Sequence, residues 1–437
     1  MPRYSTQFDQ YLEFKTEPQL INDLTLQVLD GLRMERVNRK AYKVAVEKII
    51  INLFTAWKNN SRKVVGFSRR TSFWDAKNPM DNRFYNNQSL GFANVTKSLD
   101  VLVARGWVIE VTKGFYDRQE KHGRTTRYKA SRKLCDAFLE HGLTLSMVRH
   151  SDIKKSVVLR AKKPPKTKKN PNPKGKRIGY KSNKKIVQME KNIQKINWAL
   201  DKAHIDLYLT RAEEKKLNEH MTKKAQLENE NIREIQFQDK ALQRIFNVDF
   251  EHGGRFYGGF WQQIPKEYRT RLTIYNSRTF EQDYSSIHFS ILYNKIGQPL
   301  DKDPYKITGV DRGTVKLVLN FMLNSEHLKS CLGACRNSNK VTKPKGFKTW
   351  KDFILFLQSH HEPIKKYFFT GYGLKLQKID SDLAEQVLLE MHEKGKVILC
   401  IHDSFVCRLR DLGDLIKCMN NASLSQLGFR LFSEPKV

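Results

Sequence analysis

Residues 279–288 read Thr-Phe-Glu-Gln-Asp-Tyr-Ser-Ser-Ile-His, and residues 397–405 read Val-Ile-Leu-Cys-Ile-His-Asp-Ser-Phe. Each stretch places an aspartate, Asp283 or Asp403, at the end of a run that is typical of a β-strand. A fold that joins the two strand ends would bring two carboxylates together, and such a pair can hold two Mg²⁺ ions. Two such ions clamp the attacking and leaving oxygens of an in-line phosphoryl displacement. The two stretches therefore predict a two-metal phosphoryl-transfer site.

Two basic residues lie between these aspartates at helical spacing. Arg312 and Lys316 are four residues apart, so they share one face of the helix predicted over residues 312–324. Two such cations often form only a solvated face, but the apolar residues Leu319 and Phe321 require this helix to dock. Docked beside the aspartates, the cations would neutralise a triphosphate, and Lys316 could protonate the pyrophosphate leaving group.

Four segments of the chain resemble, in the same order, conserved segments of the family A DNA polymerases and of the single-subunit RNA polymerases of phages and mitochondria. They are residues 254–265 (beginning Gly-Arg-Phe-Tyr), 283–288 (Asp-Tyr-Ser-Ser-Ile-His), 312–324 and 402–405 (His-Asp-Ser-Phe), all within about residues 250–410, under half of the chain. One segment alone would be a weak match, but four in order are specific. The resemblance implies an α+β fold: a right-hand polymerase palm with abbreviated fingers and a helical thumb.

The resemblance also implies a role for each matching residue. Asp283 and Asp403 would be catalytic and would hold two Mg²⁺ ions, which Mn²⁺ could replace, with the backbone carbonyl of Tyr284 as a neutral ligand. The implied nucleotide-binding residues are Tyr284, His288, Arg312, Lys316 and Asn324, and Lys316 is also implied to be catalytic. The implied nucleic-acid-binding residues of the palm are Arg255, Gln262, Gln263 and His402.

The residues that would select the sugar give conflicting indications. In the DNA polymerases a glutamate five residues after the first aspartate blocks the ribose 2′-OH, and His288 stands at that place here. The RNA polymerases have a small residue there and a Tyr-Gly pair at the end of the fingers helix, where this chain has Asn324 and Ser325. Ser404, in contrast, matches the RNA polymerase form. Because a histidine is bulky enough to crowd a 2′-OH, His288 favours deoxynucleotides.

The net charge indicates nucleic acid as a partner. With 79 Lys and Arg against 46 Asp and Glu, the chain has a formal charge of +33. A field of this sign attracts phosphate backbones, although an anionic membrane surface or a merely solvated basic surface are alternatives. The sequence contains no apolar run of about 18 residues and no signal peptide, so we expect no membrane partner. The six scattered cysteines favour a reducing compartment.

The N-terminal half has the element order of a DNA-binding module. Helical periodicity over residues 41–57 and 92–104 is followed by a strand-like run over 107–111, a polar loop over 113–123 and a return strand over 125–129. This order resembles a winged helix-turn-helix, with a small structural helical subdomain as the alternative. The residues expected at the exposed start of its recognition helix are Asn94, Thr96, Lys97 and Ser98.

Composition divides the chain into four parts. Residues 1–150 are expected to be the winged-helix domain. Residues 151–185, rich in lysine and proline, are expected to be a flexible linker, either a passive tether or a strap across a nucleic-acid backbone. Residues 186–247 fit a thumb of two antiparallel helices, with a coiled-coil arm as the alternative. Residues 248–437 would form the palm and fingers.

Three further residues could in principle bind zinc. His327, Cys331 and Cys335 recur every four residues on a predicted helix, with His360 or His361 as a fourth ligand. Because the paired Cys-x-x-Cys spacing of zinc sites is missing, we interpret them as ordinary helix residues.

Together these observations predict a template-directed nucleotidyltransferase. The favoured version is a compact DNA-directed DNA polymerase that uses DNA and nucleoside triphosphates in the replication of a phage, plasmid or other mobile element. No proofreading is expected, because the N-terminal half lacks the clustered acidic metal ligands of an exonuclease. The expected compartment is the cytoplasm of a bacterium or phage-infected host, with the mitochondrial matrix second. Two alternatives stay open: a DNA-directed RNA polymerase or primase, and a non-catalytic replication initiator.

Overall fold

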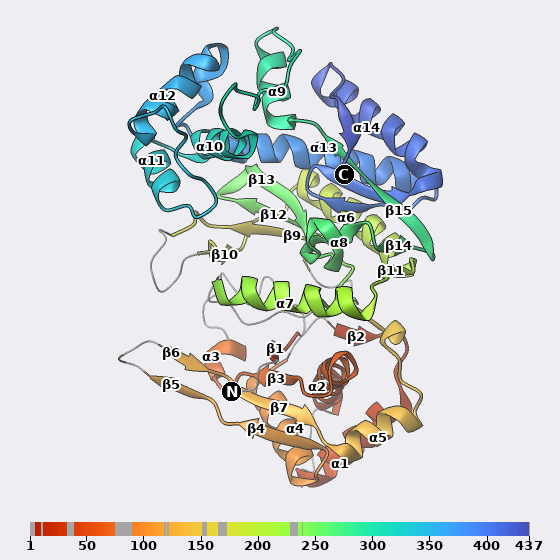
Figure 1. The fold of residues 1–437 in the computed structure, drawn as a ribbon. Helices are drawn as coiled ribbons and strands as arrows, with labels where there is room; N and C mark the ends of the chain where they lie inside the picture. The colour runs from red at the N-terminus through yellow and green to blue at the C-terminus, as the bar shows by residue number, and fades with distance from the viewer. Residues whose placement is uncertain are drawn as a thin grey trace.

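The computed structural model contains two groups of elements, each with its own hydrophobic core. It describes residues 5–436 except 10–11, 33–38, 75–89, 118, 120–121, 151–154, 165–172, 228–234 and 238. One core is built from residues between Leu12 and Val148, and the other from residues between Val157 and Leu431. Figure 1 shows the first group, coloured red to orange, below the second, with helix α7 (Arg211–Leu227) between them.

Helices and a four-stranded sheet form the N-terminal group. The sheet has the order β1-β3-β7-β4, with β1 parallel to β3 and the other pairs antiparallel. Its strands are β1 (Ser5–Gln7), β3 (Val64–Phe67), β7 (Thr126–Ala130) and β4 (Val108–Thr112). The other paired strands are β2 (Leu12–Phe14) with β8 (Val148–His150), and β5 (Phe115–Asp117) with β6 (His122–Arg124). The helices are α1 (Gln19–Gly31), α2 (Arg39–Asn59), α3 (Thr71–Trp74), α4 (Phe92–Ala104) and α5 (Arg132–Glu140).

The helices and strands that the sequence predicts in this half are present. The helix predicted over residues 92–104 is α4, and the strand–loop–strand that follows it is β4, a connecting segment and β7. Within the predicted loop, β5 pairs antiparallel with β6, and each of these strands is only three residues long. Strands this short do not show an alternation of apolar and polar residues that could have predicted them. The prediction for residues 118, 120 and 121 lies outside the described residues.

Two of the four residues expected to be exposed on α4 are buried, so the prediction is wrong for them. Thr96 and Ser98 are 6% and 0% exposed, and the Thr96 hydroxyl donates to the carbonyl oxygen of Phe92 over 2.7 Å. The buried face of α4 is wider than the stripe of three apolar residues on which the prediction rested. Asn94 is half-buried and Lys97 is exposed, so only these two remain accessible to a partner.

Two sheets form the centre of the C-terminal group. One has the order β10-β9-β12-β13, and the other has the order β11-β14-β15-β17-β16, with β18 also paired to β15. The strands of the first are β10 (Arg177–Ile178), β9 (Val157–Arg160), β12 (Gln243–Asn247) and β13 (Asp249–Tyr257). The strands of the second are β11 (Ile205–Leu207), β14 (Leu272–Ile274), β15 (Ser277–Tyr284), β17 (Ser404–Arg408), β16 (Leu399–Ile401) and β18 (Ser433–Pro435).

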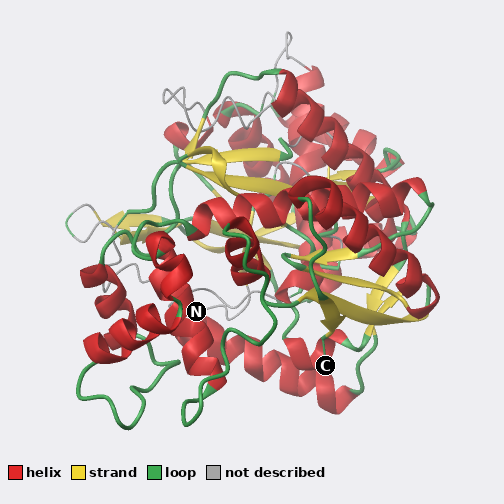
Figure 2. Cartoon of the chain, turned by 90° about the horizontal axis from the view of Figure 1, so that it is seen from above, coloured by secondary structure: helices red, strands yellow, loops and turns green. Residues whose placement is uncertain are grey.

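Helices surround these sheets, as the red and yellow elements of Figure 2 show. Helix α13 (Gly373–Glu393) packs across β13 and contacts α6 (Lys184–Lys202) and α14 (Leu412–Leu427). The remaining α-helices of this group are α7, α8 (Lys266–Arg269), α9 (Ile287–Lys295), α10 (Arg312–Asn324), α11 (Leu328–Arg336) and α12 (Trp350–His360). In the described part of the chain, every helix is too short or too polar to cross a membrane.

Part of the predicted flexible linker, residues 151–185, is a strand, so the prediction is wrong for that part. Strand β9 lies between β10 and β12, and its first three residues are buried. Its apolar run, residues 157–159, is short and lies among lysines and prolines, whose composition dominated the prediction. The prediction for residues 151–154 and 165–172 lies outside the described residues.

Residues 186–247 contain two helices, as predicted, and two strands that were not predicted. Helices α6 and α7 account for most of the segment. Strands β11 and β12 belong to the two central sheets, because each is paired there with a strand beyond residue 247. The C-terminal end of the expected thumb, which includes β12, is therefore part of the central sheets of the C-terminal group. With its helices and its mostly antiparallel strands, the chain has an α+β fold.

Candidate active site

Asp283 and Asp403 lie next to each other at one end of the second sheet. Strands β15 and β17 pair antiparallel, with Asp283 opposite Ser404. Asp403 precedes Ser404 and lies in the tight turn between β16 and β17. The backbone N–H of Tyr284 donates to the backbone carbonyl oxygen of Asp403 over 3.3 Å. The structure thus brings together the two carboxylates that the sequence predicts to be partners.

The backbone beside each aspartate adopts an unfavourable conformation. His402, which precedes Asp403 in the turn, has a φ of 63°, and Ser286, which precedes helix α9, has a φ of 48°. Residues other than glycine seldom occupy this left-handed region. Such strain persists only where surrounding structure holds it, and it clusters at sites that fix the direction of a side chain. Here the paired strands β16 and β17 hold the strained backbone of His402, and the junction between β15 and α9 holds that of Ser286.

The two carboxylates have different environments. Asp283 Oδ1 is buried and has no hydrogen-bond partner in the described part of the chain, whereas Asp283 Oδ2 lies 2.9 Å from Nζ of Lys436. Burial, and then the charge of Asp403, raise the pKa of Asp283 to about 6. Burial acts on Asp403 in the same direction, but the positive charges of Arg255 and Lys436 outweigh it and leave its pKa below the ordinary value. Asp403 is therefore ionised over a wider pH range than Asp283.

These residues fit a divalent cation of the Mg²⁺ type. Mg²⁺ is commonly bound through one or two carboxylates together with water and substrate phosphates. The pair offers two carboxylates, one with a buried oxygen that receives no hydrogen bond from any described residue. Among the described residues, no group of three His, Cys, Asp or Glu side chains could hold a metal. The carbonyl of Tyr284, water and substrate phosphates would therefore have to complete the ligand shell.

A buried carboxylate that sequence analysis missed joins two of the predicted site residues. Asp380, on α13, is 1% exposed and accepts hydrogen bonds from Nε and Nη2 of Arg255, at 3.0 Å for Nε. Its Oδ2 also lies 2.9 Å from Nε2 of His288. Arg255 and His288 both lower the pKa of Asp403. The cluster of Asp380, Arg255 and His288 therefore lies beside the carboxylate pair. No motif in the sequence of α13 marks Asp380.

The two cations of α10 lie over one aromatic ring. The guanidinium carbon of Arg312 and Nζ of Lys316 are 5.2 Å and 5.6 Å from the ring centroid of Tyr305. Arg312 Nε also donates to Asp303 over 2.5 Å. Burial raises the pKa of Tyr305, and the charge of Asp403 adds to that rise. Tyr305 therefore lies close to both the cations and the carboxylate pair, and neither Tyr305 nor Asp303 was predicted.

Helix α10 begins where the sequence predicts, because Asp311 caps it. A side-chain oxygen of Asp311 accepts from the backbone N–H of Thr314 over 2.7 Å. Asn324, in contrast, is exposed at the other end, roughly 18 Å along the helix from Arg312 at about 1.5 Å per residue. The structure therefore does not bring Asn324 together with the predicted triphosphate ligands.

Gln262 makes three hydrogen bonds within the protein, and its predicted contact with nucleic acid stays a prediction. Its amide nitrogen donates to the carbonyl oxygens of Phe256 and Cys400, each over 3.0 Å, and its amide oxygen accepts from the N–H of Gly258 over 3.0 Å. These bonds fasten the short helical turn η2 (Phe260–Gln263) to β13 and β16. Gln263 is half-buried at the end of the same turn.

His402, which is predicted to contact the end of a primer, directly precedes Asp403. It is half-buried beside Asp403, its ring centroid is 5.2 Å from that of Tyr257, and its buried Nδ1 has no partner in the described structure. Burial, and then the charge of Arg255, lower its pKa. A neutral ring with an unsatisfied nitrogen can exchange a hydrogen bond with a ligand.

The three residues considered for zinc do not converge. His327 is exposed at the start of α11, whereas Cys331 and Cys335 are buried in the core. The neighbouring thiol of Cys335, together with burial, raises the pKa of Cys331, and all six cysteines are free. His361 is buried elsewhere, 3.1 Å from the carbonyl oxygen of Pro304.

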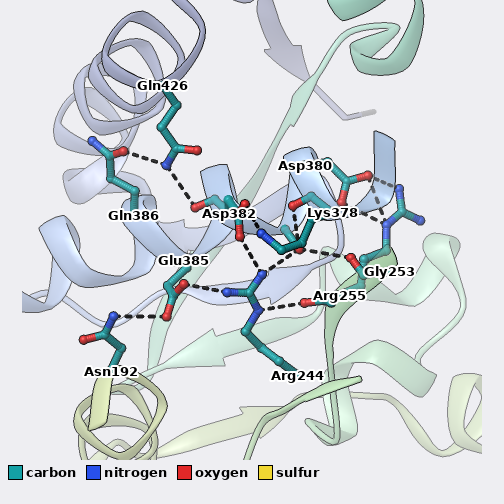
Figure 3. A network of polar contacts seen from close by, with 12 residues as sticks. Asn192, Arg244, Gly253, Arg255, Lys378, Asp380, Asp382, Glu385, Gln386 and Gln426 are labelled. Atoms are coloured by element: carbon teal, nitrogen blue, oxygen red, sulfur yellow. Dashed lines mark hydrogen bonds and ion pairs between the residues drawn. The ribbon is translucent and has the colours of Figure 1, made fainter. Parts of the chain in front are cut away.

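A fully buried arginine positions the helix that carries Asp380 (Figure 3). Arg244, on β12, is 0% exposed. Its guanidinium donates, over 2.6 to 2.8 Å, to the carbonyl oxygen of Gly254, the hydroxyl of Ser381 and the carboxylates of Asp382 and Glu385. Gly254 precedes Arg255, and Ser381 follows Asp380. Arg244 therefore fixes the position of α13 on β13 and, with it, the pairing of Arg255 with Asp380.

Comparisons with known proteins find no matching family model and no matching curated protein. One solved structure with partial similarity is the POL domain of Pol1 from M. smegmatis in complex with DNA primer-template and dNTP. It shares 14% sequence identity with this chain at a TM-score of 0.25, and the match covers 45% of this chain and 46% of that one. The chain thus matches less than half the length of that structure. At such a low similarity, function has to be inferred from the side chains of the site.

Proposed function

We propose that the chain is a template-directed nucleotidyltransferase, and specifically a compact DNA-directed DNA polymerase without proofreading. The observation that carries the proposal is the pair of Asp283 and Asp403 at one sheet end, with a buried carboxylate oxygen that no group among the described residues satisfies. Two exposed cations, Arg312 and Lys316, lie beside Tyr305, which is close to the same pair. Carboxylates for metal ions and cations for a triphosphate are the two components that phosphoryl transfer requires.

The chain's own residues would bind and orient the reactants. Metal ions held by the two carboxylates would supply activation of the attacking hydroxyl and stabilisation of the leaving oxygen. Arg312 would exchange its hydrogen bond with Asp303 for one with a phosphate, which a guanidinium binds well. The ammonium group of Lys316 would bind the same triphosphate and donate a proton to the leaving pyrophosphate oxygen.

Deoxynucleotides are the proposed substrates. Ser404, the residue that matched the RNA polymerase form, is fully buried and donates to Glu281 over 2.6 Å, so its hydroxyl has a structural partner. It therefore gives no support for ribonucleotides. His288 is held by Asp380 beside the carboxylate pair, where a fixed ring can restrict the space next to a ribose.

The basic charge and the N-terminal group support DNA as the template. A formal charge of +33 favours binding to any nucleic-acid backbone. The helix, strand and hairpin order of the N-terminal group, with Lys97 exposed on α4, supports delivery to a chosen DNA site. Replication of a phage, plasmid or other mobile element in a bacterial cytoplasm would use such an enzyme.

A primer-extension assay on the full chain tests the proposal. Labelled dNTPs or NTPs would be supplied with primed and unprimed DNA, with Mg²⁺ or with a chelator. We expect dNTP incorporation on primed DNA that the chelator abolishes. NTP incorporation on unprimed DNA would instead identify an RNA polymerase or primase. DNA binding without incorporation of either nucleotide, in Mg²⁺ or Mn²⁺, would identify a non-catalytic initiator and contradict the proposal.

A further inference from the structure

Lys436 approaches the carboxylate pair from the edge of the sheet. Its Nζ lies 2.9 Å from Asp283 Oδ2 and 3.6 Å from Glu281 Oε1. Its charge also acts on Asp403 and lowers the pKa of that carboxylate. The side chains of Lys436 and Asp283 are only 26% and 20% exposed, so water screens this ion pair weakly. The ammonium group of Lys436 therefore lies within ion-pairing distance of two carboxylates, and one of them, Asp283, belongs to the proposed metal site.

The backbone around Lys436 is held by the sheet. Strand β18 pairs with β15 from Gln282 to Tyr284, beside Asp283 itself. The backbone N–H of Lys436 donates to the carbonyl oxygen of Glu281 over 2.9 Å. A lysine side chain has four flexible carbons. The ammonium group can therefore leave the carboxylates while the strand stays paired.

The ammonium group and a divalent cation would compete for Asp283. Two carboxylates placed together in a partly buried site repel each other and need a positive charge. Without metal, Lys436 supplies that charge at Oδ2 of Asp283, while Oδ1 has no partner among the residues that the structure describes. A divalent cation bound to Asp283 would come within a few ångströms of the ammonium group, where like charges repel strongly.

We propose that Lys436 is a built-in counter-cation, which stabilises the carboxylate pair in the metal-free protein and which a divalent metal must displace from Asp283. The proposal rests on the metal site of the proposed function. Metal affinity is then set partly by a residue that is not a ligand. Loading the site with metal would also free the ammonium group of Lys436 to bind another anion.

Direct binding of Mn²⁺ to the full chain tests the proposal without any assay of activity. Free Mn²⁺ would be measured by electron paramagnetic resonance during titration of wild type, Lys436→Gln and Lys436→Arg. We expect Lys436→Gln to bind Mn²⁺ about tenfold more tightly than wild type, because one competing charge is gone. Lys436→Arg keeps the charge and should stay close to wild type.

A matched lysine and a ligand variant serve as controls. Lys155 is 23% exposed and pairs with Glu190 over 3.2 Å, so Lys155→Gln removes the same charge from a similar ion pair. It should leave Mn²⁺ affinity unchanged. Asp283→Asn should abolish Mn²⁺ binding, which would place the bound ion at the carboxylate pair.

Thermal unfolding in a chelator gives a second measurement. Lys436→Gln should unfold at a lower temperature than wild type without metal, and saturating Mn²⁺ should reduce the difference.

The possible outcomes separate this inference from the proposed function. Mn²⁺ binding that requires Asp283 but is equal or weaker in Lys436→Gln would overturn the role of Lys436 and leave the metal site intact. An equal gain in Lys155→Gln would assign the effect to net charge and would also overturn it. Failure of Mn²⁺ to bind, or binding that Asp283→Asn does not reduce, would overturn the role of Lys436 as a competitor of the metal. The proposed function is decided separately, by the primer-extension assay with and without chelator.

Discussion

Asp380 connects the residue expected to read the sugar with the residue expected to contact nucleic acid. Arg255 donates to it, and His288 lies 2.9 Å from it through Nε2. A carboxylate on one ring nitrogen fixes the orientation of a histidine. The ring of His288 is therefore positioned by a buried charge, in contrast to a surface histidine that is free to rotate. This rigidity is what a steric barrier to the ribose 2′-OH requires.

Replacing His288 with alanine should relax sugar selection. His288→Ala opens space beside the ribose, so the ratio of kcat/KM for an NTP to that for its dNTP should rise by about ten- to two-hundredfold. Tyr293→Phe is the control, because Tyr293 lies on the same helix and contacts His361 instead; its ratio should not change. If His288 instead binds a 2′-OH, the ratio in His288→Ala would fall, and that result would favour an RNA polymerase.

The hydrogen bonds of Arg244 determine how α13 packs on the sheet formed by β10, β9, β12 and β13. A single buried guanidinium joins β12 to β13 and α13, and Asn192 of α6 reaches the same Glu385 over 3.1 Å. Removing one partner of a buried charge network leaves the others unpaired in a medium of low dielectric constant. Loss of Arg244 would therefore destabilise the packing of α13, the helix that carries Asp380.

Arg244→Met should therefore destabilise the protein by about 3 to 5 kcal/mol, measured by urea unfolding. It should also lower activity, because the Arg255–Asp380 pairing depends on the position of α13. The control is Arg271→Met, since Arg271 is 53% exposed and pairs with Glu213 on the surface. Surface ion pairs contribute little to stability, so Arg271→Met should lower the free energy of unfolding much less than Arg244→Met. Equal losses in the two variants would show that the buried network has no special role.

Helices and strands with a strong local pattern could be predicted from the sequence. Contacts between side chains that only the folded chain brings together could not. Helices α4 and α10 have the predicted bounds, because periodicity and a breaker or cap mark them. Strand β9 was missed because its short apolar run is surrounded by lysine and proline. Asp380 and Lys436 were missed because each finds its partners through pairing between distant segments. No local spacing encodes such partners.

The N-terminal and C-terminal groups of elements have separate hydrophobic cores. Each predicted site residue from Arg255 to Asp403 belongs to the C-terminal group, and α4 belongs to the other. Contacts such as the hydrogen bond from Asn59 to Gln236, 3.1 Å long, connect the two. The residues predicted to be catalytic and the helix predicted to bind DNA therefore belong to different cores.

Deleting residues 1–150 should therefore preserve extension of a pre-annealed primer and remove preference for a DNA site. Extension rate and competition between DNA sequences would be measured on the same truncated protein, with circular dichroism to establish that it is folded. A folded protein that cannot extend a primer would mean that the two groups form one catalytic unit.

The most direct measurement compares nucleotide incorporation and DNA binding in Asp283→Ala and Asp403→Ala. DNA affinity should remain near that of wild type, because a charge near +33 drives association. Incorporation should fall below about a hundredth of wild type, since loss of a metal ligand removes several kcal/mol of barrier lowering. Asp136→Ala, at a 59% exposed aspartate of α5 in the N-terminal group, should keep full activity. Incorporation above that level in either variant of the pair would contradict the two-metal assignment.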